Sequence, residues 1–313
     1  MVKGVALLFP GQGSQYAGMG KDLSERHAEA RAVYERADAA LGPLGLTVSA
    51  VSFEGSEEEL KQTSVTQPAI LTHSIAVWEV LRARGVAPAL TAGHSLGEYS
   101  ALVAAGALSL EDALVLVRRR GLFMQEAVPA GAGAMSAVIG LAPEDVAAAC
   151  AEAASTAGGT CAPANYNAPE QTVIAGTAGA VAKATEILKG KGAKRVLPLP
   201  VSAPFHCALM QPAAEKLAPF LEATRFFPLA FPVVTNVDAA PNADPAAARE
   251  ALRRQVCSPV RWVETVRFLS GAAPAAIECG PGSVLAGLAK RIAKDWPVTA
   301  TSDAAGLERL LGA

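Results

Sequence analysis

A serine lies between two glycines at the point where an apolar strand pattern gives way to a helical pattern. Residues 93–97 read GHSLG, with Ser95 at the centre and Glu98 three residues after it. A G-x-S-x-G pattern is typical of a sharp turn from strand to helix, where there is room only for small residues beside the serine. At such a turn the serine is exposed near a helix N-terminus, whose N–H groups can stabilise an oxyanion. A stretch of this kind can also simply form a loop.

Strand and helix patterns alternate on both sides of this turn. The apolar run VALLFP favours a buried parallel strand, and a second strand is expected at 89–93. Helical patterns cover 74–85, 97–108 and 110–127. This alternation predicts an α/β fold, with a mostly parallel sheet that carries helices on both faces.

The pattern changes after Pro129. Strand patterns at 134–140, 160–167, 171–176 and 194–200 enclose helical patterns at 142–155 and 178–192. The order β-α-β-β-α-β is that of a ferredoxin-like unit. The α/β pattern then returns, with a strand expected at 231–239. We therefore predict a large domain formed by 1–129 and 202–313, with a small ferredoxin-like domain, 130–201, inserted into it.

Composition excludes several classes of protein. Half of the 313 residues are hydrophobic, enough for a substantial core, and the net charge of −2 gives no indication of nucleic-acid binding. The five cysteines are odd in number and never spaced C-x-x-C, which favours reduced thiols over disulfides or a metal site. No stretch is typical of a signal peptide or a membrane span. We expect a cytoplasmic protein with no metal, no membrane contact and no nucleic-acid partner.

A serine nucleophile needs a base within hydrogen-bonding distance, and the chain has four histidines. His27 lies in a charged helical pattern, KDLSERHAEARAVYERAD, and is expected at the surface. His73 lies in an apolar pattern and is expected in the core, and the ring of His94, next to the serine, should point elsewhere. His206, in the proline-rich segment VSAPFHCALM, is the remaining candidate, although a buried histidine bonded to backbone would look the same.

No acid is evident that could orient His206. An α/β-hydrolase would have Asp or Glu between the serine and a histidine near the C-terminus, whereas more than a hundred residues follow His206. The acceptor can instead be a backbone carbonyl. An ester hydrolase becomes less favoured, and a Cys207–His206 pair is disfavoured because sequence neighbours rarely face each other.

One arginine lies on an apolar stripe. Ala113, Val117, Arg120 and Met124 follow each other at helical spacing, while the two arginines before Arg120 point elsewhere. A buried arginine needs an anionic partner, either a structural Asp or Glu or the carboxylate of a substrate. The loop GQGSQ after the first strand lacks the lysine and spacing of a phosphate loop, but its N–H groups can supply an oxyanion donor.

Together these segments resemble the malonyl-CoA:acyl carrier protein transacylases of fatty acid synthesis and the acyltransferase domains of polyketide synthases. The likeness runs almost end to end, through FPGQGSQ, QPAILT, AGHSLGEYSAL, RRRGLFMQEAVP, NYNAPEQTVIAG, LPVSAPFHCALM, SPVRWVETV and IECGPGSVLAGLAKRI. It implies an α/β-hydrolase-like domain with a ferredoxin-like insertion. It further implies ping-pong transfer of a malonyl group from malonyl-CoA to the pantetheine thiol of acyl carrier protein, with no cofactor.

The resemblance also implies residue roles. Ser95 matches the nucleophile, His206 its base, and Arg120 the partner of the malonyl carboxylate. Gln12 and Leu96 match the oxyanion donors, and the carbonyl of Gln255 matches the acceptor that orients the histidine. Positions near the acyl pocket are matched by Gln67, Met124 and Asn167.

Phe205, directly before the histidine, is similar to the H-A-F-H pattern of malonyl-selective domains, although Ala203 and Pro204 match neither that pattern nor Y-A-S-H. Acyl carrier proteins are acidic, so a basic docking face is expected. The candidates are Lys189, Lys191, Lys194 and Arg195, which can equally be ordinary solubility charges. A monomer is expected. Two other functions remain open, a serine thioesterase or esterase and a non-catalytic carrier-protein-binding module.

Overall fold

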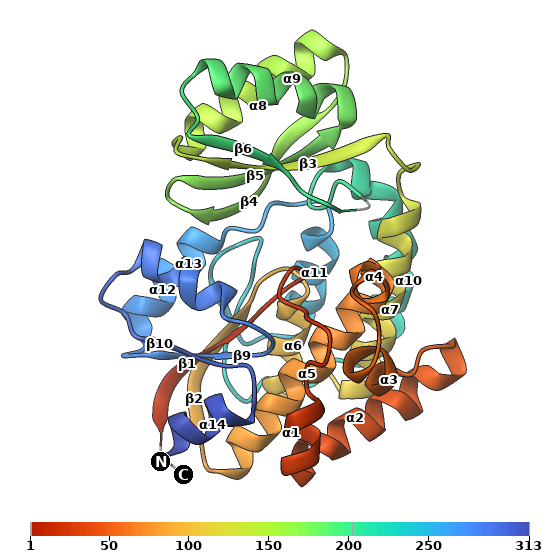
Figure 1. Ribbon diagram of the computed structural model, residues 1–313, viewed down its shortest axis with the longest axis vertical. Coiled ribbons are helices and arrows are strands. Elements are labelled where there is room, and N and C mark those ends of the chain that lie inside the picture. The colour runs from red at the N-terminus through yellow and green to blue at the C-terminus, as the bar shows by residue number, and fades with distance from the viewer. Residues whose placement is uncertain (1, 202, 313) are drawn as a thin grey trace.

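A computed structural model describes residues 2–201 and 203–312. Its strands form two separate sheets, and the ribbon in Figure 1 shows a smaller lobe above a larger one. The two ends of the chain lie close together at the bottom of the larger lobe (Figure 1). Within the described residues, no helix is both long enough and apolar enough to cross a membrane.

The larger lobe is built on a six-stranded sheet in the order β10-β9-β1-β2-β7-β8. All neighbours pair in parallel except β7 with β8. The strands are β1 Lys3–Phe9, β2 Ala87–Gly93, β7 Val233–Val234, β8 Pro241–Asn242, β9 Ala276–Cys279 and β10 Val298–Thr301. The carboxyl ends of β1 and β2 lie side by side, and this edge is where the GQGSQ loop and the serine turn begin.

Helices pack on both faces of this sheet. Because side chains alternate along a strand, Leu7 and Phe9 of β1 enter one hydrophobic core, and Ala6 and Leu8 enter a second core on the other face. The helices of this lobe are α1 Lys21–Arg26, α2 Ala28–Leu41, η1 Gly42–Leu44, α3 Val48–Phe53, α4 Glu57–Lys61, α5 Thr63–Ala83, α6 Gly97–Ala104, α7 Leu110–Glu126, η2 Ala208–Met210, α10 Gln211–Ala223, α11 Pro245–Gln255, α12 Trp262–Ala272, α13 Val284–Ile292 and α14 Ala304–Leu311.

The smaller lobe is a four-stranded antiparallel sheet in the order β4-β5-β3-β6. Its elements are β3 Gly133–Ile139, α8 Pro143–Ala157, β4 Cys161–Ala168, β5 Gln171–Thr177, α9 Ala178–Gly190 and β6 Arg195–Pro198. Figure 1 shows α8 and α9 covering the face that points away from the larger lobe. This is the ferredoxin-like arrangement, so the predicted fold class is confirmed; the domain boundaries at 129/130 and 201/202 stay a prediction.

Backbone hydrogen bonds join the two lobes along β4. The N–H of Tyr166 donates to the carbonyl of Val260, and the N–H of Val260 donates to the carbonyl of Ala164, both at 2.9 Å. This short parallel bridge places β4 of the small lobe directly against the segment that precedes α12. The pairing holds the small lobe above the carboxyl edge of the large sheet.

Three expected elements differ from the structure. The helix expected around His27 is broken at that residue, whose backbone is extended, into α1 and α2. Only Val233–Val234 of the strand expected at 231–239 pairs with β2. The helix expected at 74–85 begins at Thr63 and continues through Pro68. Proline has no N–H, which frees the carbonyl of Ser64, and Arg118 donates to that carbonyl at 2.7 Å.

Candidate active site

The serine turn is as tight as the two glycines predict. Ser95 has a φ of 51°, a left-handed conformation that L-residues rarely adopt. A Cβ on Gly93 would lie 1.9 Å from the carbonyl carbon of Gly97, and a Cβ on Gly97 would lie 2.1 Å from the carbonyl oxygen of Phe9. Both positions therefore require glycine. The close packing of strand, turn and helix holds the serine hydroxyl at the carboxyl edge of the sheet.

His206 reaches this hydroxyl from the segment that follows the small lobe. Its Nε2 lies 2.7 Å from Ser95 Oγ, and its Nδ1 lies 3.0 Å from the main-chain oxygen of Gln255. A carbonyl oxygen can only accept, so Nδ1 carries the proton and Nε2 is free to accept the serine proton. The hydroxyl of Ser95, the ring of His206 and the carbonyl of Gln255 thus form one hydrogen-bonded series. His206, like Ser95, has a left-handed backbone conformation, with φ 57°.

The environment keeps His206 neutral. Burial, and secondly the positive charge of Arg120, lower the pKa of His206 to about 3. A neutral imidazole is the form that can accept a proton, so the ring of His206 is in this form over the whole range of physiological pH. Arg120 also donates to Ser95 Oγ at 3.2 Å, which favours negative charge developing on that oxygen.

Arg120 is 2% exposed and has no carboxylate within ion-pair distance in the described part of the chain. It donates instead to two amide oxygens, Oε1 of Gln67 at 2.8 Å and Oε1 of Gln255 at 2.9 Å. Its Nε has no protein partner. A buried guanidinium held by neutral acceptors keeps its charge available, and none of the described residues is the directly bonded Asp or Glu considered from the sequence.

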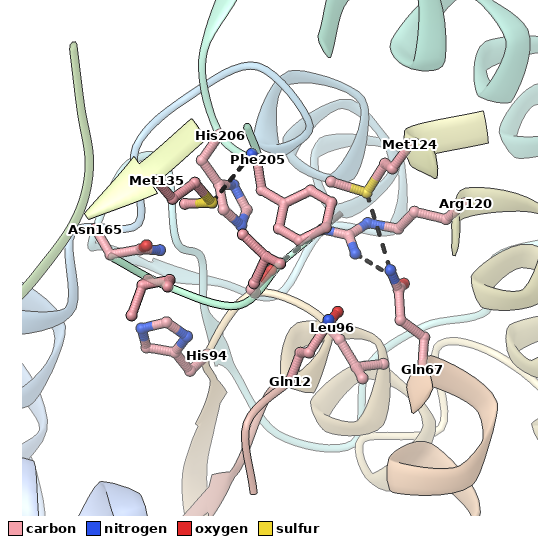
Figure 2. A pocket seen from close by; sticks show the side chains of 13 residues that line it. Gln12, Gln67, His94, Leu96, Arg120, Met124, Met135, Asn165, Phe205 and His206 are labelled. Atoms are coloured by element: carbon pink, nitrogen blue, oxygen red, sulfur yellow. Dashed lines mark hydrogen bonds between the residues drawn. The ribbon is translucent and has the colours of Figure 1, made fainter. Parts of the chain in front are cut away.

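These groups face a small cavity of about 110 Å³ between the two lobes (Figure 2). Its lining joins polar groups of the large lobe to mostly apolar groups of the small lobe and its connections. The lining residues are Gln12, Gln67, His94, Ser95, Leu96, Arg120, Met124, Met135, Asn165, Leu199, Val201, Phe205 and His206. The volume is suited to an acyl group of a few carbon atoms, with the rest of a thioester outside.

Two backbone N–H groups point to an oxyanion site. Within the described residues, the N–H groups of Gln12 and Leu96 donate to no protein acceptor, whereas the N–H of Ser95 donates to Asn236 Oδ1 at 2.7 Å. The loop that carries Gln12 is packed on the serine turn, because a Cβ on Gly11 would lie 2.5 Å from the His94 carbonyl oxygen. The loop and the turn therefore present two free donors beside one hydroxyl.

The remaining sequence candidates divide into two groups. Gln67, Met124 and Phe205 line the cavity. The amide of Gln67 accepts from Arg120 through its oxygen, and its Nε2 lies 3.9 Å from the sulfur of Met124 (Figure 2). Asn167 does not line it; its Oδ1 lies 2.8 Å from His94 Nε2. The asparagine that lines the cavity is Asn165, two residues earlier on β4.

Sequence reasoning missed several residues of the site. Glu98 and Asn236 are fully buried and bonded to the catalytic segment, and Met135, Leu199 and Val201 line the cavity. The position of Glu98, one turn after the serine, was a usable signal. The others carry none, because a lone asparagine or an apolar residue far along the chain gives no sign of where it will lie.

The other predicted groups lie apart from the cavity. His73 is buried, as expected, and His27 is half-buried at the break between α1 and α2. Lys191 lies 3.8 Å from Glu152, and Lys194 lies 3.3 Å from Glu170, so half of the expected basic patch faces a negative charge. Among residues 2–201 and 203–312, no three His, Cys, Asp or Glu side chains are grouped as metal ligands.

Comparisons with known proteins show the family of the chain. Residues 6–308 match the family model of the acyl transferase domain. The chain is 48% identical to the malonyl CoA-acyl carrier protein transacylase of Salmonella typhimurium over 98% of both chains, and 47% identical to that of Bacillus subtilis over 97% of this chain and 95% of the other.

Solved structures give the same result. An acyl carrier protein S-malonyltransferase from Vibrio cholerae superposes with a TM-score of 0.94 at 48% identity, covering 98% of this chain and 99% of the other. A malonyl-transacylase in complex with its type II PKS acyl carrier protein also has a TM-score of 0.94, at 47% identity and 99% coverage of both.

Proposed function

We propose that this chain, which belongs to the acyl transferase family, transfers the malonyl group of malonyl-CoA to the pantetheine thiol of an acyl carrier protein. The observation that carries the proposal is a buried arginine that has no carboxylate partner among the described residues and lies 3.2 Å from a serine hydroxyl that already faces a neutral histidine. A nucleophile alone is compatible with many acyl groups. The free cation beside it favours an acyl group with a carboxylate of its own.

In the first half-reaction, Ser95 Oγ attacks the thioester carbonyl of malonyl-CoA while His206 Nε2 takes the hydroxyl proton. The oxyanion of the tetrahedral intermediate is stabilised by the N–H groups of Gln12 and Leu96. The carbon–sulfur bond then breaks, and the coenzyme A thiolate leaves with the proton from His206. Malonyl-Ser95, an oxygen ester, remains, and the carbonyl of Gln255 holds the histidine in place throughout.

In the second half-reaction, the pantetheine thiol of the carrier protein attacks malonyl-Ser95, and His206 accepts the thiol proton. The ester bond breaks, and the proton returns to Ser95. Thioester, ester and thioester are close in energy, so the enzyme must chiefly exclude water from the intermediate. The apolar side chains of Met135, Leu199 and Val201 are placed to do so, and they come from the small lobe and its connections.

Selection of the acyl group is assigned to Arg120 and its neighbours. The malonyl carboxylate pairs with the guanidinium, and an acyl group without a carboxylate leaves that buried charge unpaired, which costs about a hundredfold in rate. Gln67 and Met124 flank the guanidinium, and Phe205 packs beside the base. We propose that Phe205 limits space at the acyl α-carbon and so favours malonyl over methylmalonyl. Asn167 bonds to His94, which lines the cavity, so any effect of Asn167 on the acyl group is exerted through that ring.

The carrier protein is proposed to dock on positive charge. Of the four candidate residues, Lys189 and Arg195 are the better choices, since the other two lie near glutamates. Replacing both with glutamate should raise the KM for carrier protein and leave the KM for malonyl-CoA unchanged; an unchanged KM for both would dismiss this surface. We also propose a monomer that needs no cofactor, because one chain supplies every protein group in the mechanism. A cytoplasmic location is proposed because all five cysteines are free thiols.

Intact-protein mass spectrometry tests the proposed function. The wild-type protein mixed with malonyl-CoA should gain one malonyl group, acetyl-CoA should give little adduct, and Ser95→Ala should give none. Carrier protein with its pantetheine arm should then discharge the adduct. Steady release of free malonate without an adduct would instead indicate a thioesterase, and neither adduct nor release would indicate a non-catalytic carrier-protein-binding module.

A further inference from the structure

A buried carboxylate that takes no part in the mechanism above lies directly beneath the nucleophile. Glu98, in the first turn of α6, is 1% exposed. Its Oε2 accepts two hydrogen bonds, from Gln255 Nε2 at 2.7 Å and from the main-chain N–H of Asn236 at 3.0 Å. Burying a carboxylate is costly unless its hydrogen bonds are well made, so a glutamate here needs a reason beyond packing.

The amide of Gln255 connects this carboxylate to Arg120. Its Nε2 donates to Glu98 and to the carbonyl of Ser95, at 3.0 Å, and its Oε1 accepts from Arg120. A carboxylate can only accept hydrogen bonds, so Glu98 fixes which end of the amide faces it. If the amide turned over, its oxygen would face the carboxylate and its NH₂ would face the guanidinium, and both contacts would be repulsive.

We propose that Glu98 is a positioning residue for acyl selection, which holds the amide of Gln255 so that Arg120 keeps its place beside Ser95 without a direct carboxylate partner. The negative charge balances the buried guanidinium through one intervening amide. A carboxylate bonded directly to Arg120 would compete with the malonyl group, whereas a neutral amide oxygen does not. This inference rests on the proposed malonyl transfer.

The charges around Glu98 come from several elements. Arg120 on α7 favours its ionised form, and Asp238, after β7, opposes it, although Asp238 is itself paired with Arg254 of α11 at 2.8 Å. Burial is the largest effect and raises the pKa of Glu98 to about 7. The carboxylate is therefore partly protonated near neutral pH, and a protonated Glu98 can donate as well as accept, which removes the constraint on the amide.

Glu98→Gln tests the proposal, because it keeps the shape and removes the acceptor-only character. The readout is the ratio of malonyl to acetyl loading on Ser95 from the two CoA thioesters. We expect this ratio to fall about tenfold, the effect of losing one hydrogen bond to a charged group. A purely structural role would lower both loading rates together and leave the ratio unchanged, and an unchanged ratio would overturn the proposal.

Two further measurements keep the test decisive. Glu278→Gln is the matched control, because Glu278 is also a buried glutamate, and within the described part of the chain its carboxylate bonds only to the N–H groups of Leu285 and Ala286 of α13. It should leave the ratio unchanged. In a Gln255→Met background, Glu98→Gln should have no further effect on the ratio, since Glu98 acts through that amide. A full additional loss in this background would contradict the proposed route.

The wild-type protein provides a test that does not depend on a variant folding. Its malonyl-to-acetyl ratio should fall as the pH is lowered from about 8 to about 6, through the pKa of Glu98, while the CoA phosphates cancel because both thioesters carry them. A ratio that is flat over this range would overturn the proposal. If the wild-type protein forms no malonyl adduct at all, the proposed function itself fails, which is a separate outcome.

Discussion

Two buried histidines of the large lobe have nearly the same surroundings, yet only one lies in the candidate site. His206 Nδ1 lies 3.0 Å from a backbone carbonyl and its Nε2 lies 2.7 Å from the hydroxyl of Ser95. His73 Nε2 lies 2.9 Å from the carbonyl of Ser302 and its Nδ1 lies 3.2 Å from the hydroxyl of Tyr34. Burial lowers the pKa of both rings, to about 3 and about 4.

The difference lies in what surrounds each hydroxyl. Tyr34 is packed in the core, where a Cβ on Gly20 would lie 1.9 Å from its hydroxyl oxygen, so no substrate can approach. Ser95 faces a cavity with free N–H donors and the guanidinium of Arg120. A chain of carbonyl, histidine and hydroxyl is therefore not by itself a catalytic site. The cavity and the charge beside Ser95 are what distinguish the candidate site.

The largest expected effect comes from removing the hydroxyl of Ser95, which faces His206. Ser95→Ala should lower malonyl transfer by at least about 10³-fold, because no covalent intermediate can form. Tyr34→Phe removes the hydroxyl that faces the other histidine, His73, and should leave the rate of transfer near that of the wild-type protein. Steady-state transfer to carrier protein measures both. Comparable losses in the two variants would mean that the cavity does not distinguish the two histidines.

Removing the charge should have the next largest effect. Arg120→Gln should lower malonyl loading about a hundredfold and change acetyl loading much less, because only the malonyl group has a carboxylate to pair. Arg119→Gln is the matched control on the same helix, since the Arg119 guanidinium lies over the ring of Phe220, 3.9 Å from its centre. Quench-flow loading with the two CoA thioesters gives the rates. Equal losses for malonyl and acetyl would rule out pairing with the carboxylate.

A smaller effect is expected at the wall of the cavity. Phe205→Ser should raise loading of methylmalonyl relative to malonyl by about tenfold or less, the scale of one methyl group in an apolar pocket. Phe205 is 8% exposed and lines the cavity next to His206. Competition between the two CoA thioesters, read by adduct mass, measures the preference. An unchanged preference would assign the choice to other lining residues, with Met135 the next to test.

The sequence predicted the fold well, and the site in part, for reasons visible in particular residues. The glycines around Ser95 favoured a sharp turn at that spacing, and the structure shows why, since a Cβ at either position would strike backbone. Alternation of strands and helices is a local signal, and both sheets follow it. The GQGSQ loop indicated a possible oxyanion donor, but only the resemblance to a known family singled out Gln12, Leu96 and Gln255 as individual residues.

What remained hidden depends on long-range contacts. Asn236 bonds the N–H of Ser95 across 141 positions, and no local pattern marks it. Residues two apart on a regular strand share a face, but the pairing of β4 is irregular between Tyr166 and Ala168; Asn165 lines the cavity and Asn167 does not. The break at His27 likewise has no local sign, because the helical pattern around it contains neither glycine nor proline.

The smallest effect on activity is expected at the second histidine, where the change should appear in stability. The pKa of His73 is lowered on folding, so the unfolded chain binds more protons below about pH 6.5, and His73 makes the fold less stable as the pH falls toward 4, by about 1.4 kcal/mol per pH unit. His73→Gln removes this contribution. The free energy of unfolding should therefore decline less steeply between these pH values than in the wild-type protein, while malonyl transfer at pH 7.5 stays unchanged.

Urea unfolding at a series of pH values measures the slope of the free energy of unfolding against pH. Since His206 is present in both proteins, the difference in slope belongs to His73. An equal slope would mean that His73 is already charged in the folded protein, and the likeness between the two histidines would then end at their hydrogen bonds.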